Sequence, residues 1–237
     1  MNIMFGIPTY DGNVDMEFHL SIINTIKQFR DIHFEHSIHK NTWVAAARNN
    51  IVENFLEKDY LTHLLLLDDD ITWTTQDISE LLKYGQDLDI VGGLYPKKDI
   101  DYNSMLDAYN QGCSKDKLHN FTGLIDNSMF DPVNKDYDLN KPVEVKKLAT
   151  GFTIIKKEVF EKIRENYPDN YYRRNGRDLF LYFDTQLIKH EDGIQYYYGN
   201  DTYFCKLWRD IGGKVYLLPW VNSSHIGKFK YQRKIFI

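Results

Sequence analysis

Cysteine is scarce in this chain, whose 237 residues include only Cys113 and Cys205. Two cysteines are too few for a disulfide framework, and these two do not have metal-ligand spacing. No apolar run approaches the roughly 20 residues that a membrane span needs, and the amino end lacks a charged leader. We therefore expect a soluble protein with no membrane span.

An excess of basic residues is also missing. The formal net charge is -5, and lysines are mixed with acidic residues along the chain, so we expect no general binding of nucleic acid. Three Asn-x-Ser/Thr sequons, at Asn120, Asn200 and Asn222, would be open to glycan attachment in a secretory lumen. Because two of them flank candidate site residues, a cytoplasmic location fits better.

No linker rich in Pro, Gly or Ser divides the chain, so residues 1–237 are expected to form a single domain. Strand patterns alternate with helix patterns, which favours an α/β fold with a doubly wound, mostly parallel central sheet flanked by helices. The expected strands are 2–8, 34–38, 64–67, 89–95, 143–147, 151–155 and 214–218, and the expected helices are 17–30, 44–57, 76–84, 157–166 and 199–211. Residues 99–140 are expected to form loops or short antiparallel strands, and 171–177 a mobile surface loop.

Four leucines, at 64–67, run directly into Asp68, Asp69 and Asp70. A buried parallel strand of this kind brings its carboxylates to the carboxyl edge of the sheet, where open α/β folds bind ligands. Clustered carboxylates repel one another unless a cation lies between them, and Asp68 and Asp70 are spaced to share a divalent ion with a ligand's phosphates. The alternative is a solvated acidic turn in which Asp70 or Thr72 caps the next helix.

Several short motifs accompany this acidic run. They are Ile7-Pro8-Thr9-Tyr10, Ala46-Ala47-Arg48-Asn49, Leu67-Asp68-Asp69-Asp70, Gly199-Asn200-Asp201 and His225-Ile226-Gly227-Lys228. Together they resemble the GT-A fold of small, soluble, DxD-containing glycosyltransferases of the family 2-like type, which use nucleotide sugars. The resemblance extends over most of the chain and is strongest in about its first hundred residues.

The resemblance implies that residues 1–98 form a nucleotide-binding half and residues 99–237 an acceptor-binding half. The residues that it places near the base, ribose or phosphates of the nucleotide are Pro8, Thr9, Tyr10, Arg48, Asp68, Asp69 and Lys228. The metal ligands that it implies are Asp68, Asp70 and His225, for Mn²⁺ or Mg²⁺.

The resemblance also implies that Asp201 is the catalytic residue. Glu is commoner in the family where this chain has Asn200, so Asp201 is the only carboxylate of the pair. An acidic residue near a helix N-terminus stays ionised and can accept the proton of an acceptor hydroxyl. The expected reaction is metal-dependent transfer of a sugar from a UDP-linked or other nucleotide-sugar donor to a glycan or other hydroxyl acceptor, with inversion. A retaining course becomes the expectation if no carboxylate reaches the acceptor.

Each of these residues has a plainer alternative. Asp201 is then an anion near a helix N-terminus, and His225 is a surface or hydrogen-bonded histidine. Arg48 points to solvent or pairs with Glu53, and Lys228 belongs to a solvated basic tail.

Two other classes of function compete with the transferase. The run from Leu66 to Thr72 also fits the hhDxDxT pattern of haloacid-dehalogenase-like phosphatases, in which Asp68 would be the nucleophile, Asp70 the acid/base and Mg²⁺ the cofactor. That motif normally follows the first strand of its fold, whereas two strand-helix units precede it here. The other class is a non-catalytic module that binds a sugar or nucleotide and retains the fold.

Overall fold

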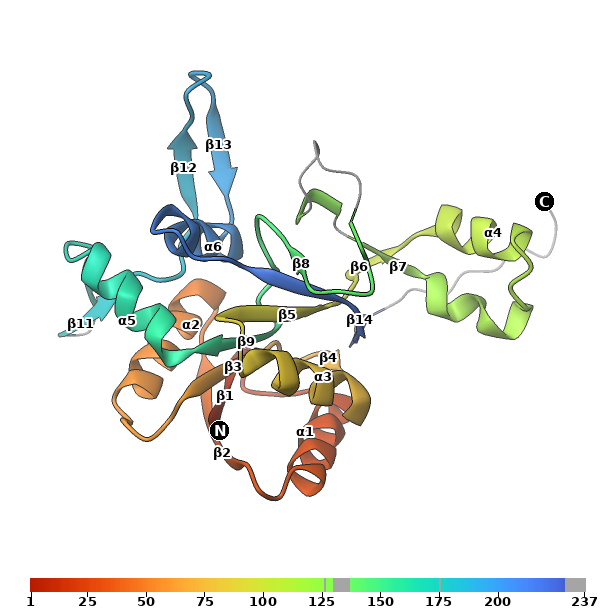
Figure 1. Cartoon of the computed structure of the whole chain (residues 1–237), viewed down its shortest axis with the longest axis horizontal. Helices are drawn as coiled ribbons and strands as arrows, with labels where there is room; N and C mark the ends of the chain where they lie inside the picture. Colours follow the sequence, from red (N-terminus) through yellow and green to blue (C-terminus); the bar gives the residue numbers. More distant parts are fainter. Residues whose placement is uncertain (126, 130–136, 175, 229–237) are drawn as a thin grey trace.

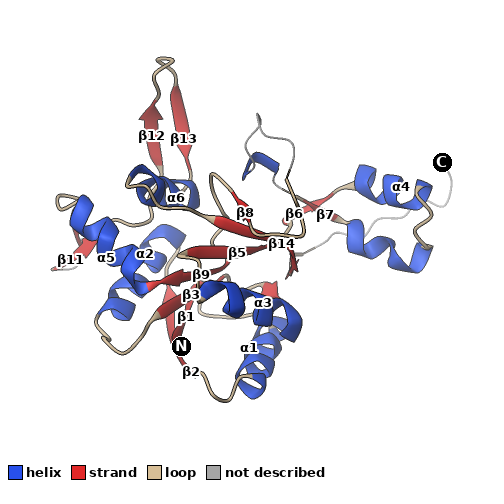
Figure 2. Cartoon of the chain, in the orientation of Figure 1, coloured by secondary structure: helices blue, strands red, loops and turns tan. Residues whose placement is uncertain are grey.

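A seven-stranded sheet forms the centre of the computed structural model, which describes residues 1–125, 127–129, 137–174 and 176–228. The strand order is β2-β1-β3-β9-β5-β14-β8, and helices cover both faces (Figure 1, Figure 2). The strands are β1 (Asn2–Thr9), β2 (His33–Lys40), β3 (His63–Leu67), β5 (Ile90–Leu94), β8 (Val143–Glu144), β9 (Phe152–Lys156) and β14 (Tyr216–Asn222).

The sheet is mostly parallel. Strand β1 is parallel to β2 and β3, and β14 is parallel to β5. Strand β9 is antiparallel to both of its neighbours, β3 and β5, and β8 is antiparallel to β14. Five of the seven strands therefore point the same way, and the predicted fold class, an α/β fold with a mostly parallel central sheet flanked by helices, is confirmed.

Helices from different parts of the chain cover the two faces. They are α1 (Met16–Gln28), α2 (Val44–Leu56), α3 (Thr75–Gly85), α5 (Lys157–Asn166) and α6 (Asn200–Asp210). Helix α4 (Tyr102–Asn110) lies away from the sheet (Figure 1). Helices α2, α5 and α6 contribute to one hydrophobic cluster and α1 and α3 to the other. Within the described residues, no helix has the length and apolar character needed to cross a membrane.

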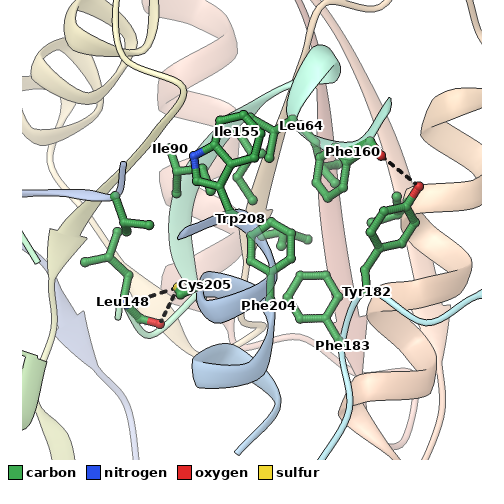
Figure 3. Packing of buried hydrophobic residues seen from close by; sticks show 14 of the residues in the cluster. Leu64, Ile90, Leu148, Ile155, Phe160, Tyr182, Phe183, Phe204, Cys205 and Trp208 are labelled. Carbon is green, nitrogen blue, oxygen red and sulfur yellow. Dashed lines mark hydrogen bonds between the residues drawn. The ribbon is translucent and has the colours of Figure 1, made fainter. Parts of the chain in front are cut away.

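Aromatic side chains fill the cluster beneath α2, α5 and α6 (Figure 3). Phe204 stacks on Phe160, with ring centroids 5.6 Å apart, and on Phe183, with centroids 4.6 Å apart. Cys205 lies in the same cluster, and burial raises the pKa of its thiol to about 12. This packing anchors α6, which begins at the candidate site.

The segment from 99 to 140 contains more helix than the sequence pattern predicts. Helix α4 and the 3₁₀ helices η1 (Lys115–Phe121) and η2 (Asn127–Met129) lie there, beside the short antiparallel pair β6 (Lys97–Ile100) and β7 (Gly123–Leu124). Asp101 caps α4 by accepting a hydrogen bond from the backbone N–H of Ser104. Helix α4 buries only Ala108, so it needs no apolar face. Its sequence therefore lacks the apolar periodicity from which a helix is predicted.

Most of the segment expected to be a mobile loop, 171–177, lies instead in two antiparallel strands, and residue 175 lies outside the described residues. Strand β10 (Tyr171–Arg174) pairs with β11 (Arg177–Phe180), and Arg173 forms a cross-strand ion pair with Asp178. The backbone N–H of Phe180 donates to the Glu53 carboxylate on α2, which fixes the hairpin to that helix. A second hairpin, β12 (Gln186–Lys189) and β13 (Gln195–Tyr198), projects from the domain just before α6 (Figure 1).

Candidate active site

The acidic motif forms a tight turn at the carboxyl end of β3. The Asp68 N–H donates to the Gly151 carbonyl at 2.9 Å, and the Ile71 N–H donates to the Asp68 carbonyl at 3.2 Å. The chain then forms β4 (Ile71–Thr72), which pairs with β15 (Ser224–His225) so that His225 lies opposite Ile71. This pairing brings His225 beside Asp70.

Helix α3 does not use the acidic motif as its cap. Thr74 is the N-cap residue, and it forms a reciprocal capping box with Asp77. The alternative in which Asp70 or Thr72 caps this helix is therefore wrong. The carboxylates of the motif have other partners.

Asp70 points towards two cationic or potentially cationic groups. Its Oδ1 lies 3.1 Å from Nε2 of His225, and its Oδ2 forms an ion pair with the ammonium of Lys98. Burial alone would raise the pKa of the Asp70 carboxyl, but the hydrogen bonds from His225 and Lys98 outweigh that effect and lower the pKa below 3.8. Asp70 is therefore ionised at neutral pH.

The imidazole of His225 is held by a backbone carbonyl. Its Nδ1 lies 2.8 Å from the Pro96 carbonyl oxygen, which can only accept, so Nδ1 carries a proton. The 3.1 Å contact between Nε2 and Asp70 Oδ1 is a hydrogen bond when Nε2 also carries a proton, and a metal ion that replaced this proton would find Nε2 already directed towards the Asp70 carboxylate. Metal-binding histidines are commonly oriented in this way, with the second ring N–H donated to a backbone carbonyl.

Asp68 has an entirely different partner. Its Oδ1 accepts at 2.8 Å from the guanidinium of Arg48 on α2, and Arg48 also donates to Asp201 Oδ1 at 2.6 Å. The Arg48 side chain is only 3% exposed. Burial opposes the charge on Arg48, but Asp201 and Asp68 outweigh it and raise the pKa of the guanidinium. Arg48 is thus a buried cation that joins the acidic motif to α6.

Asp201 lies in the first turn of α6, where the helix dipole favours an anion. Its Oδ1 accepts from Arg48 and from the hydroxyl of Thr150. These donors hold the carboxylate in place through one oxygen, which leaves Oδ2 as the oxygen suited to accept a proton. The side chain is 30% exposed, so it is within reach of solvent.

A cleft of about 290 Å³ lies at this edge of the sheet. Its lining residues are Pro8, Thr9, Tyr10, Asn41, Thr42, Val44, Asp68, Asp69, Asp70, Lys98 and His225. The structure thus brings together the predicted segment at the end of β1, the acidic motif and His225. Tyr10 is 69% exposed and Thr9 is buried.

Three predicted site residues are not among those that line the cleft. Arg48 and Asp201 connect to it through Asp68, and Lys228 lies exposed three residues beyond His225. A backbone hydrogen bond also joins the acidic motif to the start of α1, because the Asp15 N–H donates to the Asp69 carbonyl at 3.0 Å. Burial, reinforced by the neighbouring carboxylates, raises the pKa of Asp69.

The residues present fit a divalent cation held partly by a ligand. Among the described residues, no group of three His, Cys, Asp or Glu is placed to hold a metal ion. Asp70 and His225 adjoin, whereas Asp68 is turned to Arg48. Magnesium sites often use one or two carboxylates and complete the shell with water and substrate phosphates. A cation at Asp70 and His225 would follow that pattern.

Three residues of the site were not predicted from the sequence: Lys98, Thr150 and Tyr95. A side chain at Gly151 would clash with this arrangement, since an added Cβ would lie 2.3 Å from Asp68 Oδ2 and 2.6 Å from the Tyr95 hydroxyl. Lys98 follows the predicted strand 89–95 at the same edge of the sheet, so the sequence contained a signal for it. Tyr95 ends that predicted strand and so has the same signal, whereas the contacts of Thr150 have no such local signal.

Neither a protein-family model nor a curated protein matches this chain. Among solved structures, A197 from STIV has a TM-score of 0.53 and 21% identity, over 96% of this chain and 87% of that chain. The structure of GalNAc-T7 with UDP, GalNAc and Mn²⁺ has a TM-score of 0.49 and 12% identity, over 97% of this chain and 43% of that chain. At these identities the likeness concerns the fold alone and shows no family or activity.

Proposed function

We propose that this chain is a metal-dependent glycosyltransferase. It transfers a sugar from a nucleotide-sugar donor, UDP-linked, to a hydroxyl of a glycan or another acceptor. The observation that carries the proposal is the pairing of Asp70 with a His225 ring whose Nδ1 is fixed by the Pro96 carbonyl, inside a cleft that also contains the segment Pro8 to Tyr10. The mostly parallel α/β sheet, which brings the acidic motif to the edge where the cleft lies, supports it.

The donor occupies the cleft in this proposal, within the half formed mainly by residues 1–98. The exposed ring of Tyr10 stacks on the base, as aromatic faces do with nucleobases. Pro8 and Thr9 flank the ribose, whose hydroxyls donate to the Asp68 and Asp69 carboxylates. Lys228, exposed just beyond His225, extends towards the phosphates.

Asp70 and His225 hold the divalent cation, Mn²⁺ or Mg²⁺. When bound, that cation stabilises the negative charge that develops on the leaving diphosphate. Arg48 has a positioning role here rather than the direct nucleotide contact predicted from the sequence, because it is buried and paired with both Asp68 and Asp201.

Asp201 is the catalytic base of the proposal. Arg48 and Thr150 hold its Oδ1, and Oδ2 takes the proton of the acceptor hydroxyl as that oxygen attacks the anomeric carbon. The carbon–oxygen bond to the acceptor forms as the bond to the diphosphate breaks, which inverts the anomeric centre. Residues 99–237 supply most of the acceptor side.

The phosphatase alternative is disfavoured by the partner of Asp68. A nucleophilic aspartate needs a carboxylate that is free to attack. Asp68 Oδ1 instead forms an ion pair, at 2.8 Å, with a buried guanidinium that neutralises its negative charge. Two strand-helix units, β1-α1 and β2-α2, also precede the motif. Trapping of beryllium fluoride on Asp68 would support the phosphatase.

Hydrolysis of UDP-sugars in the presence of Mn²⁺ tests the proposal, since many sugar donors react slowly with water when the acceptor is absent. We expect measurable release of UDP by the wild type and a loss of about 100-fold in Asp70→Ala. Asp59→Ala is the matched control, because the side chain of Asp59 is fully exposed. Equal rates in the two variants would contradict the proposal, and Mn²⁺-dependent UDP binding without turnover would favour the binding module.

A further inference from the structure

Lys98 has an unusual position in the cleft. It lies on β6, lines the cleft with Asp69 and His225, and places its ammonium against Asp70 Oδ2. The side chain is 44% exposed, and its stem passes close to Gly227, since a Cβ added there would lie 3.3 Å from the Lys98 Cδ. Lys98 is thus a partly exposed cation that pairs with Asp70, the same carboxylate that His225 contacts.

The charges of the cleft explain why such a cation is needed. Asp68, Asp69 and Asp70 all line the cleft, and an anionic diphosphate would be repelled by them. Arg48 is buried and paired with both Asp68 and Asp201, so its charge is already balanced within the protein. Lys98 is the lysine among the cleft-lining residues, and it already neutralises part of the acidic motif.

The geometry points to Lys98 as an exchangeable counter-ion: it holds Asp70 in the free protein, leaves Asp70 when a divalent cation binds, and then binds the phosphates of the donor. This inference rests on the proposed function and adds a residue to its site. A lysine suits this role because its ammonium is a point charge on a flexible stem. A half-exposed stem can turn from Asp70 to a neighbouring phosphate without rearrangement of the strand.

Exchange of this kind has two consequences of opposite sign. Without nucleotide, Lys98 competes with the divalent cation for Asp70, so its removal strengthens metal binding. With nucleotide and metal present, Lys98 contacts the phosphates, so its removal weakens nucleotide binding. A lysine that only stabilised the fold would produce neither pattern.

The experiment measures binding of Mn²⁺ by electron paramagnetic resonance and binding of UDP by calorimetry in the wild type and Lys98→Met. We expect Lys98→Met to bind Mn²⁺ about tenfold more tightly without nucleotide and UDP about tenfold more weakly in saturating Mn²⁺. Lys98→Arg, which keeps the charge, should remain within about threefold of the wild type in both. Circular dichroism confirms that each variant is folded.

Lys27→Met is the matched control, because it removes the same charge from an exposed residue in the last turn of α1. Its Mn²⁺ and UDP affinities should equal those of the wild type. Unchanged or weaker Mn²⁺ binding in Lys98→Met, or unchanged UDP binding, overturns the exchange. If the wild type takes up Mn²⁺ but no UDP, the proposed function fails, while tighter Mn²⁺ binding in Lys98→Met would still support the competition at Asp70.

Discussion

Asp68 and Asp70 are two residues apart and yet belong to different environments. Asp68 turns inward to Arg48, which is 3% exposed, whereas Asp70 turns to Lys98, which is 44% exposed, and to His225. The turn closed by the Ile71 N–H and the Asp68 carbonyl separates them. The two carboxylates are about equally exposed, at 25% and 26%, and both line the cleft, so they differ in their partners. The first is fixed by a buried guanidinium, and the second has partners that a ligand can replace.

The difference shows how one short motif can serve both structure and binding. Arg48 ties Asp68 to Asp201, so the end of β3 and the start of α6 are held in a fixed relation. Asp70 is left at the cleft with partners that exchange at little cost, since exposed ion pairs contribute weakly to stability. Substitutions at the two carboxylates and their partners should therefore have unequal effects on stability and binding.

The largest expected effect on stability comes from Arg48→Met. Loss of the guanidinium leaves Asp68 and Asp201 without their shared cation, and we expect a decrease of about 3 kcal/mol in the free energy of unfolding. Urea denaturation followed by circular dichroism measures it. A decrease below about 1 kcal/mol would show that the network is not structural.

We expect acid to lower the free energy of unfolding first through His63, at the start of β3. Burial lowers the pKa of His63 to about 4, although its hydrogen bond to the Gly85 carbonyl opposes this. The unfolded chain, with a histidine pKa near 6.5, binds the proton more readily, so stability is full above pH 6.5 and falls as the pH approaches 4. We expect a loss on the order of 2–3 kcal/mol across this window.

Thermal or urea melts between pH 7.5 and 4 measure the loss, and His63→Gln should reduce the slope. His19→Gln, on an exposed position of α1, is the control and should keep it. Identical slopes in the wild type and His63→Gln would assign the acid sensitivity to other groups, including the carboxylates at the cleft.

Gly151→Ala should disturb the carboxylate of Asp68 and leave that of Asp70 in place. The added Cβ would lie 2.3 Å from Asp68 Oδ2, so Asp68 must move away from its contact with Arg48. We expect a loss of about 1–3 kcal/mol in stability, measured by urea denaturation. Gly199→Ala, where an added Cβ meets nothing within 4 Å, should lose less than half as much. Equal losses would show that the close approach to Asp68 is tolerated.

The smallest effect on stability is expected for Asp70→Asn. Its partners are at the cleft, so the free energy of unfolding should change by no more than about 0.5 kcal/mol. Binding of UDP in the presence of Mn²⁺ should nevertheless be lost, as calorimetry can measure. A large loss of stability would mean that Asp70 is as structural as Asp68.

The sequence was most informative where a pattern is local. Helix α5 has the predicted bounds, 157–166, and the alternation of strands and helices indicated the α/β sheet. Helix α4 was missed because it buries only Ala108. The apolar pattern of β9 indicated a strand but not its antiparallel direction, since both directions give a buried apolar run.

For the candidate site, the sequence predicted which residues gather at the cleft, but it did not predict which partners each of them contacts. Pro8, Thr9, Tyr10, the acidic motif and His225 line one cleft. The strand-end position predicted this for the acidic motif, and the resemblance to the GT-A fold implied it for the other residues. The turn after Asp68 was not foreseen, and it directs Asp68 and Asp70 to separate partners. The link from Arg48 to Asp201 joins residues far apart in the chain, which no local spacing can indicate.

Calorimetric titration of UDP in the presence and absence of Mn²⁺ tests whether Asp70 and His225 hold a cation that binds a diphosphate. The wild type and Asp59→Ala should bind UDP only with Mn²⁺, and His225→Ala should lose this binding while remaining folded. Absence of any Mn²⁺- or Mg²⁺-linked nucleotide binding by the folded wild type, or full binding by His225→Ala, would contradict the assignment of the cleft.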